Sequence, residues 1–543
     1  MDSRDTWHLR KPRSREVLFP LTNSVPTPRP KVFGARGASV LTVPPPSWST
    51  SVSAKEAHRS YWTDYLYDQN PILKWQKTGV SNMAGEISLL FGFLLWIATI
   101  PPIRRKFFEL FYYTRHFYIL FIIFFIFHVG ISYTCIMLPG FYLFLVDRCL
   151  RFLQSRRQVR LVSARVLPCE AVELNFSKSH GLTYNPTSVM FINVPNISKL
   201  QWHPFTVTSN SNLERDKLSV VIKSGGTWTK KLYQLLSTPS SIDRLVVSVE
   251  GPYGPISTDY IRHDTLVMVS GGSGITPFIS ITRELIHLKT ALKWKIPKVV
   301  LICAFKNSSS LSMLDLIFPI SGTPSDISDM KLQIEAYLTR DKELKADGPI
   351  HPKTIWLKPN SSDAPIHATL GPNSWLWLAA IISSSFIIFI ILIGIITCYY
   401  IFPIDHNSNK IFSFTLNAFL NMLVICVSIA SVASAAFLWN KKYNAKEVKQ
   451  IQNMEGSTPT VSPNSMVYNA EKELESLPYQ SLIHATNVHY GERPDLRRML
   501  FEHRELSVGV LASGPKIMRQ EVATICSSGL AENLHFESIS FSW

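Results

Sequence analysis

The chain is poor in charged residues for its length. Asp, Glu, Lys and Arg make up 17% of its 543 residues, whereas hydrophobic residues make up 46%. The seven cysteines are scattered, and no Cys-x-x-Cys pair occurs. The sequence therefore indicates neither a disulfide framework nor a zinc site. Few charges and many apolar residues favour a protein with membrane spans.

Acidic residues are missing from a long stretch near the start of the sequence. None occurs between Glu16 and Glu56, where Pro, Ser, Arg and Thr are common. This composition predicts a disordered, atypical region over residues 1–72. Two interpretations stay open, a plastid transit peptide and a solvated tail without a targeting role.

The net charge of +16 is concentrated in three clusters, each beside an apolar run. The clusters cover residues 104–106, 148–160 and 441–449. This placement suits anionic lipid headgroups and the cytoplasmic side of a membrane. No nucleic-acid motif with interleaved aromatic residues stands out. We therefore expect membrane lipid as a partner and no nucleic acid.

Uncharged runs predict helices before residue 150. Residues 87–103 reach the lower limit of length for one membrane span. Residues 116–146 would extend about 46 Å as one helix, which is too long for one crossing. One helix would also place the flanking basic clusters on opposite sides, so we predict two helices, at 116–131 and 133–148. These three helices would form a partial transmembrane domain, residues 73–150.

The rest of the chain has the sequence pattern of a soluble α+β protein, and this pattern is interrupted once. Alternating and apolar segments predict a β-barrel over residues 160–262. Strand and helix patterns then alternate, which predicts a parallel α/β domain. Two uncharged stretches, each long enough to span a membrane, interrupt this domain. We assign the α/β domain to residues 263–374 and 475–543, the two inserted transmembrane helices to 375–440, and a polar linker to 441–474.

A glycine-rich turn follows the first strand of the α/β domain. Gly271, Gly272 and Gly274 stand between an apolar strand and a helical pattern that begins near Thr276 and Pro277. Glycines allow a ligand to approach the backbone closely, and a helix N-terminus favours a pyrophosphate. The spacing differs from the Gly-x-Gly-x-x-Gly of a Rossmann fingerprint. A tight turn without a ligand therefore remains an alternative when this motif is taken alone.

Three further motifs precede this turn. His203-Pro204-Phe205-Thr206 combines a rigid backbone with hydrogen-bonding side chains, although a capped strand end would explain it equally well. Gly225-Gly226-Thr227-Trp228-Thr229 precedes two lysines at a predicted helix start and would suit a phosphate. Gly251-Pro252-Tyr253-Gly254 predicts a turn.

Taken in order, these motifs and the later Gly514-Pro515-Lys516-Ile517-Met518 resemble the ferredoxin-reductase-like flavoprotein superfamily. The set is most similar to its membrane branch, which contains NADPH oxidases and ferric reductases. The two-helix insertion and the C-terminal sequence that ends in Trp543 resemble plant ferric-chelate reductases, closest to their leaf-type members. The resemblance covers about residues 72–543.

The resemblance implies a fold, cofactors and site residues. The fold would be transmembrane helices plus a ferredoxin-reductase-like FAD β-barrel and an α/β nucleotide-binding domain interrupted by a two-helix transmembrane insertion. His203, Pro204, Phe205 and Thr206 would hold the flavin and ribityl chain of FAD. The pyrophosphate of FAD would bind at Gly226, Thr227 and Thr229.

NADPH would bind in the α/β domain. The residues implied for the nucleotide are Gly271, Gly272, Gly274, Thr276 and Pro277. Thr339 and Arg340 would contact the 2′-phosphate, which favours NADPH over NADH. Gly514 and Pro515 would lie near the nicotinamide, where Ser513 replaces a cysteine that is usual in relatives. Trp543 would stack on the flavin and yield to the nicotinamide, although a packed terminal residue is an alternative for this tryptophan.

The same resemblance implies two b-type haems, each held by one histidine from each of two helices. Only His116 and His128 lie in apolar runs before the soluble part. The family pattern places a histidine where this chain has Arg115, and a shift of one residue turns a helical side chain by about 100°. We therefore expect a form that lacks part of the haem domain, with His116 and His128 as its candidate haem ligands.

The predicted function is a transmembrane ferric-chelate reductase that uses NADPH, FAD and, where complete, b-type haem in iron acquisition. One alternative is an NADPH oxidase that makes superoxide, which the inserted helices and the C-terminal sequence disfavour. Another is a haem-deficient diaphorase, or a partner of a full-length reductase or of itself. We expect a multi-pass protein of the plasma membrane, with the chloroplast envelope as the alternative.

Overall fold

The computed structural model describes residues 82–539 except residues 180, 239–243, 255–258, 318–330, 342–352, 359, 361–362, 371–373, 409–411, 413, 456–485 and 504. The described residues form two compact units. The membrane unit contains residues 82–150 and 375–436, and the nucleotide unit contains residues 151–374 and 437–539.

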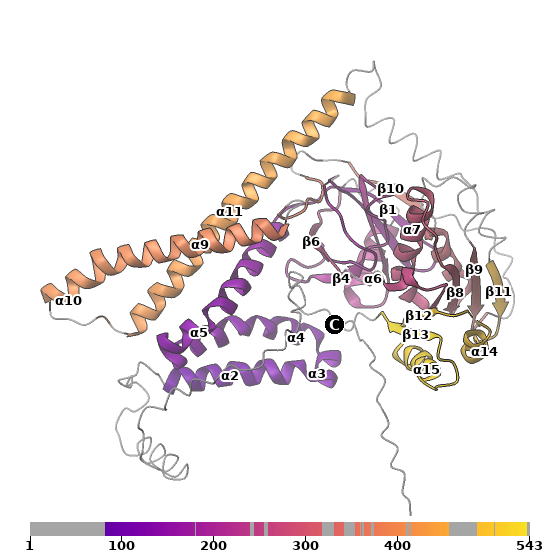
Figure 1. Cartoon of the computed structure of the whole chain (residues 1–543), viewed down its shortest axis with the longest axis horizontal. Helices are drawn as coiled ribbons and strands as arrows, with labels where there is room; N and C mark the ends of the chain where they lie inside the picture. Colours follow the sequence, from indigo (N-terminus) through magenta and orange to yellow (C-terminus); the bar gives the residue numbers. More distant parts are fainter. Residues whose placement is uncertain are drawn as a thin grey trace, which may run out of the picture. The chain divides into compact units, whose positions relative to one another are not determined.

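The membrane unit consists of helices (Figure 1). They are α2 (Asn82–Thr99), α3 (Pro101–Lys106), α4 (Phe108–Thr114), the 3₁₀ turn η1 (Arg115–Phe117), α5 (Tyr118–Ser155), α9 (Ser374–Ile396), the π-helix η5 (Thr397–Ile401), α10 (Phe402–Ser408) and α11 (Phe414–Glu455). Among the described residues, four segments are long and apolar enough to cross a membrane: Asn82–Thr99, Leu110–Gly130, Ser374–Ser408 and Leu416–Tyr443. Helix α2 ends at Thr99 because a Pro-Pro pair follows two residues later and starts α3.

Helix α5 consists of two arms that meet at a kink. Gly130 has a φ of 78° and a ψ of 172°, which no helical residue adopts. The rings of Tyr118 in the first arm and Phe144 in the second lie 5.7 Å apart. One straight helix would separate these residues by about 39 Å. The two arms therefore run back along each other, with the glycine at the reversal.

The first half of the nucleotide unit is a β-barrel. Its strands are β1 (Leu161–Leu167), β2 (Ala171–Ser177), β3 (Val189–Asn193), β4 (His203–Thr206), β5 (Lys217–Lys223), β6 (Ser248–Tyr253) and β10 (Lys353–Trp356), with helix α6 (Thr227–Ser237). They form antiparallel sheets in the orders β10-β1-β2-β5 and β4-β3-β6. Fully buried side chains such as Phe176, Met190 and Leu232 form the core.

Strand β10 corrects one predicted boundary. We assigned residues 263–374 to the α/β domain, but β10 pairs antiparallel with β1 of the barrel. Leu357 and Ile366 then join the barrel core. The chain thus returns to the barrel before α9 begins, because these apolar side chains complete that core.

The second half is a parallel six-stranded sheet in the order β11-β9-β8-β7-β12-β13. Its strands are β7 (Thr265–Gly271), β8 (Lys298–Phe305), β9 (Leu332–Leu338), β11 (Thr486–Tyr490), β12 (Val508–Ser513) and β13 (Leu534–Ser538). Its helical segments are η2 (Asp259–Arg262), η3 (Gly272–Ile275), α7 (Thr276–Thr290), η4 (Ser308–Leu316), α14 (Leu496–Phe501) and α15 (Lys516–Cys526).

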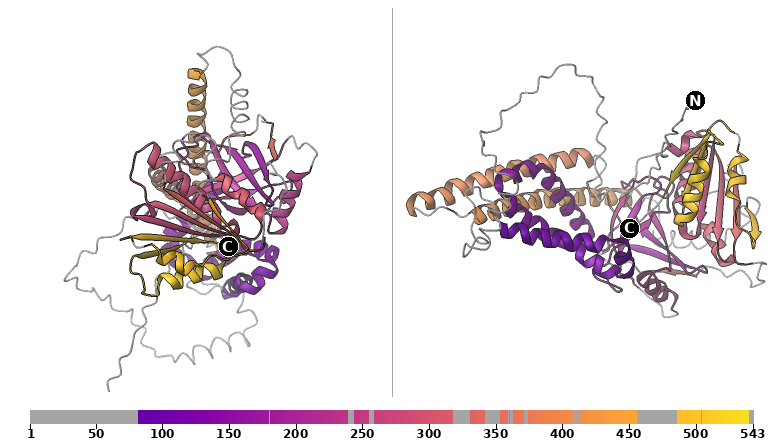
Figure 2. Two further views of the ribbon diagram at one scale, coloured as in Figure 1. Left: turned by 90° about the vertical axis from the view of Figure 1, so that its right-hand side faces the viewer. Right: turned by 90° about the horizontal axis from the view of Figure 1, so that it is seen from below.

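Helices cover both faces of this sheet (Figures 1 and 2). Leu266 and Met268 of β7 pack in the core that includes α7, whereas Val267 and Val269 pack in the core that includes α14 and α15. Burial on both faces explains why β7 is a continuous apolar run. The predicted fold class is confirmed, including the helical insertion between β9 and β11.

Candidate FAD and nucleotide site

A cavity of about 490 Å³ lies where the barrel meets the carboxyl ends of the parallel strands. Most motifs singled out in the sequence contribute to its wall. The lining residues are Val189, Pro204, Phe205, Thr206, Val221, Lys223, Gly271, Ser273, Gly274, Thr276, Pro277, Ser513, Gly514, Pro515, Arg519 and Ile539. Carboxyl ends of parallel strands are the usual place for ligands in open α/β sheets.

The barrel contributes strand β4 to this wall. Pro204, Phe205 and Thr206 line the cavity, but His203 does not. The ring of His203 instead packs against Trp228, with ring centroids 4.6 Å apart, and Phe205 stacks on the same tryptophan at 6.0 Å. Burial lowers the pKa of His203, which keeps its ring uncharged at neutral pH. Trp228 thus supports two residues of the predicted flavin motif from behind.

Helix α6 begins at the second predicted phosphate motif. Gly226 is its N-cap, and the Thr229 hydroxyl accepts hydrogen bonds from the backbone N–H groups of Gly225 (3.0 Å) and Gly226 (2.9 Å). Thr227 and Gly226 are exposed and do not line the 490 Å³ cavity. Because Thr229 caps its own helix, the groups left for an anion are the free N–H groups of the first turn.

The glycine-rich turn joins β7 to α7 through η3. Gly272 has a φ of 60°, in the left-handed region that favours glycine. A Cβ at Gly274 would lie 2.5 Å from the Ser513 carbonyl oxygen, and one at Gly271 would lie 2.6 Å from Pro515 Cδ. Side chains at these two positions are therefore excluded. The turn packs directly against the end of β12, the neighbouring strand.

The end of β12 forms the opposite wall. Ser513 is buried at the last position of the strand, and Gly514 follows with a φ of 135°. Arg519 donates from Nε to the Gly514 carbonyl (3.1 Å) and from Nη1 to the Ser538 hydroxyl (3.0 Å). This arginine therefore ties the Gly514-Pro515 turn to the end of β13, next to Ile539.

Thr339 and Arg340 follow β9 at the same edge of the sheet. The backbone N–H of Thr339 bonds to the Phe305 carbonyl (2.9 Å), and Arg340 is exposed. Strand β9 lies two positions from β7, which corresponds to about 10 Å across the sheet. A dinucleotide that starts at the glycine turn can bridge this distance. Trp543, the last predicted site residue, lies outside the described residues, which end at Ile539.

Buried polar contacts fix the barrel and the parallel sheet relative to each other. Arg283 of α7 pairs with Glu214 at 2.9 Å, with side chains only 3% and 9% exposed. Asn210 hydrogen-bonds Glu284, and the backbone N–H of Thr187 donates to the Ser280 hydroxyl. Because these contacts are buried, the cavity between the two halves has a defined shape.

Lys223 and Arg519 line the cavity but were not predicted as site residues. Lys223 ends β5 just before Gly225-Gly226, so its position beside a phosphate motif is a signal that the sequence carries. Arg519 lies in the first turn of α15, four residues after Pro515. Its contact with Ser538 depends on the pairing of β12 with β13, which the sequence does not reveal.

The two predicted haem ligands lie on the consecutive segments η1 and α5. His116 is exposed in η1 and packs on Tyr112, with ring centroids 5.8 Å apart. His128 packs on α2, where a Cβ at Gly85 would lie 2.5 Å from its Nδ1. Helix α2 contains no histidine. A bis-histidine haem takes its ligands from two helices, whereas residues 82–150 contain only His116 and His128, on the consecutive segments η1 and α5. The described part of the chain contains no group of three His, Cys, Asp or Glu side chains that could hold a metal ion.

Three family models match the chain. Residues 156–257 match an FAD-binding domain, residues 263–527 a ferric reductase NAD-binding domain, and residues 55–126 a ferric reductase-like transmembrane component. The last match includes residues 55–72, for which we predicted an atypical tail. These residues lie outside the described part of the chain.

Proteins of Arabidopsis thaliana align with most of the chain. Ferric reduction oxidase 2 is 58% identical over 490 residues, an alignment that covers 89% of this chain and 67% of that protein. The chain belongs to the ferric reduction oxidase family. Ferric reduction oxidase 7, chloroplastic, is 34% identical over 87% of this chain and 66% of its own length. A superoxide-generating NADPH oxidase subunit of Dictyostelium discoideum is 28% identical over 52% of this chain.

The cavity fits the cofactors of this family. Its walls bring backbone N–H groups, three glycines and two cationic residues, Lys223 and Arg519, to one place. A flavin and a nicotinamide nucleotide both carry flat rings and anionic phosphates, which such a wall can accommodate. The chain is thus an oxidoreductase with an FAD domain and a nicotinamide-nucleotide domain.

Proposed function

We propose that this protein takes electrons from NADPH, passes them through FAD, and delivers them to ferric chelates at a membrane. As a ferric reductase, it carries electrons from NAD(P)H via FAD to ferric iron. The observation that carries this proposal is the convergence of β4, the β7–α7 glycine turn and the β12–α15 turn on one cavity. Membership of the ferric reduction oxidase family supports the acceptor.

FAD would be held by the barrel side of the cavity. Phe205 and Pro204 would support the flavin ring, the Thr206 hydroxyl would bond to its ribityl chain, and the first turn of α6 would bind its pyrophosphate. The bound flavin supplies the conversion of a two-electron hydride into single electrons. His203 and Trp228 would keep Phe205 in place from behind, since all three rings pack together.

NADPH would be held by the sheet side. The N–H groups of the glycine turn and the start of α7 would bind its pyrophosphate, where the helix dipole is favourable. Arg340 would pair with the 2′-phosphate through charge-assisted hydrogen bonds. Gly514 and Pro515 would border the nicotinamide, and Ser513 would present a small side chain beside it. Trp543 would cover the flavin until the nicotinamide displaces it.

The transmembrane family model implies haem, yet the described residues 82–150 contain only His116 and His128, on the consecutive segments η1 and α5, whereas a bis-histidine haem takes its ligands from two helices. A diaphorase that reduces soluble acceptors, or a partner of a complete reductase, is therefore the second candidate function. We place the protein in the plasma membrane, with the chloroplast envelope as the alternative. The leaf-type assignment stays a prediction.

The test is a comparison of two activities in membranes that contain the whole protein. NADPH-dependent reduction of a ferric chelate and of a soluble dye are measured alongside the flavin and haem absorbance of the detergent-solubilised protein. Both activities together with b-type haem support the reductase. Dye reduction without chelate reduction or haem supports the diaphorase. Absence of bound flavin would overturn the proposal.

A further inference from the structure

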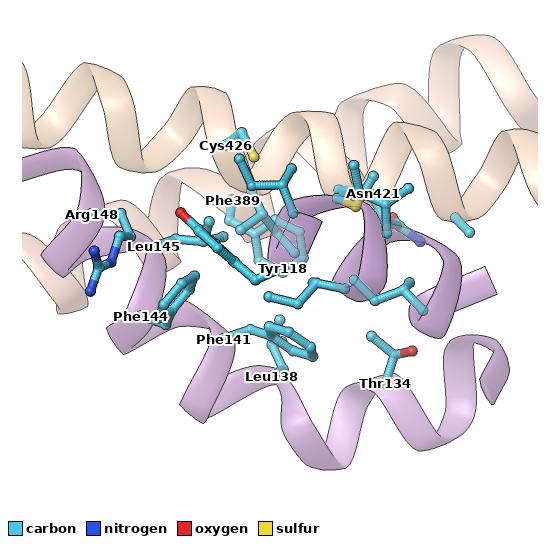
Figure 3. Close-up of a pocket in the computed structure, with 17 residues that line it drawn as sticks. Tyr118, Thr134, Leu138, Phe141, Phe144, Leu145, Arg148, Phe389, Asn421 and Cys426 are labelled. Carbon is cyan, nitrogen blue, oxygen red and sulfur yellow. The ribbon is translucent and has the colours of Figure 1, made fainter. Parts of the chain in front are cut away.

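The membrane unit contains a second cavity, of about 510 Å³ (Figure 3). Both arms of α5 line it, together with α9 and α11. The lining residues are Tyr118, Ile119, Ile122, Ile123, Ile126, Thr134, Leu138, Phe141, Phe144, Leu145, Arg148, Phe389, Ala418, Asn421, Met422, Ile425 and Cys426. Twelve of these seventeen residues are aliphatic or aromatic, and the other five are Thr134, Arg148, Asn421, Met422 and Cys426.

Such a cavity is unstable when empty and unsuited to water. An empty space deprives the lining of its dispersion contacts, and an apolar cavity gives water too few hydrogen-bond partners. Thr134, one of its few polar side chains, already donates its hydroxyl hydrogen to the Gly130 carbonyl at 2.7 Å. In a bilayer, the hydrocarbon chain of a lipid is available to fill this space.

One end of the cavity is different. Arg148 is the only charged residue among those that line it, and Figure 3 shows it at the end opposite Thr134. Its guanidinium lies 5.2 Å from the centre of the Phe144 ring and 3.6 Å from Asp147. Its Nε is buried without a hydrogen-bond partner. A donor of this kind favours an anionic oxygen.

The position of Arg148 along the chain agrees with a headgroup. It lies near the end of the second arm of α5, shortly before the chain enters β1. Arginines at such ends lie at the level of lipid headgroups. The apolar part of the cavity then extends from this level toward the kink at Gly130.

We propose that this cavity binds one anionic phospholipid, with an acyl chain between α5, α9 and α11 and the phosphate at Arg148. The lipid would fill the space between the inserted helices and the two arms of α5. Binding requires no bond to form or break. The role is structural, and it does not depend on the proposed electron transfer.

The test uses the whole protein in nanodiscs of phosphatidylcholine alone or mixed with phosphatidylglycerol. A phosphatidylglycerol with a diazirine in its acyl chain is cross-linked by light, and the labelled peptides are identified by mass spectrometry. We expect labelling within 118–126 and 418–426, and about tenfold less labelling by the matching phosphatidylcholine probe. Equal labelling by both probes, or labelling spread over all membrane helices, would overturn the proposal.

Two matched pairs of variants test the two ends of the site. Arg148→Gln should lower phosphatidylglycerol labelling about tenfold. Arg156→Gln should leave it unchanged, because Arg156 is exposed and stacks on Phe152 at a similar distance (5.4 Å) but does not line the cavity. Ala418→Trp fills the cavity and should abolish the labelling, whereas Ala435→Trp at an exposed site of the same helix should not.

Dye reduction by NADPH serves as the folding control, because none of these four residues belongs to the nucleotide cavity. If the two arginine variants lose labelling equally, the phosphate contact is wrong. If Ala418→Trp retains full labelling with intact dye reduction, the acyl chain of the lipid does not occupy this cavity. In that case a protein segment or bulk lipid covers the helices.

Discussion

The nucleotide cavity and the membrane cavity have nearly the same volume and opposite chemistry. The nucleotide cavity, about 490 Å³, is lined by glycine turns, hydroxyl groups and two cations, and a buried ion pair holds its walls. The membrane cavity, about 510 Å³, is lined by aliphatic and aromatic side chains with one arginine at its end. A polar wall selects a ligand by position and charge, whereas an apolar wall selects mainly by shape.

The largest effect should come from a side chain placed in the polar wall. Gly274→Val would bring a Cβ within 2.5 Å of the Ser513 carbonyl oxygen, so the turn must move away from β12. We expect NADPH-dependent dye reduction to fall at least about 100-fold, as misplaced binding groups commonly cause. Gly181→Ala, where a Cβ meets nothing within 4 Å, is the control. Normal activity of Gly274→Val would mean that the nucleotide binds elsewhere.

The buried ion pair that holds the polar cavity together should matter for stability. Arg283→Met leaves the Glu214 carboxylate buried without its ion-pair partner, which should cost about 3–5 kcal/mol. Thermal unfolding, monitored through the release of flavin, measures this loss of stability. Arg498→Met breaks an exposed pair with Glu502, whose side chains are 78% and 59% exposed, and should cost less than about 1 kcal/mol. Similar losses in both variants would contradict a rigid interface.

A partly buried histidine near the chain's entry into α9 should make the nucleotide unit sensitive to acid. Burial, followed by the charges of Arg157 and Lys441, lowers the pKa of His367 from 6.5 to about 4. The folded state therefore loses stability as pH falls below 6.5, with the loss complete near pH 4. Allowing for the partial exposure of His367, we expect the free energy of unfolding to fall by about 2 kcal/mol. Urea unfolding of wild type and His367→Gln at pH 7.5 and 5 measures this effect.

If His367→Gln shows the same difference in unfolding free energy between pH 7.5 and pH 5 as the wild type, the acid sensitivity has another source.

The smallest expected effect concerns the far end of the nucleotide site. Arg340→Ala should raise KM for NADPH about tenfold, equivalent to about 1.4 kcal/mol, and leave KM for NADH unchanged. Steady-state dye reduction with both nucleotides measures the two constants. Lys306→Ala, one strand away, is a useful comparison. Equal changes in KM for NADPH and NADH would contradict the proposed contact between Arg340 and the 2′-phosphate.

Much of the nucleotide cavity could be predicted because its motifs are local. Gly271 to Pro277 are contiguous, and a glycine turn between a buried strand and a helix has few possible structures. Residues that act through distant partners were missed. Arg519 reaches Ser538 only because β12 pairs with β13, and β10 joins the barrel only because Leu357 and Ile366 complete its core.

The sequence alone determined the order of domains, the apolar helices and the glycine turns, because periodicity, run length and glycine spacing are properties of neighbouring residues. It also carried the family resemblance. Only the tertiary structure decided which residues face each cavity. In this structure the ring of His203 packs against Trp228. Arg148 lies at the end of a second cavity, which is formed by segments far apart in sequence. Such contacts depend on packing between distant segments, which no local pattern specifies.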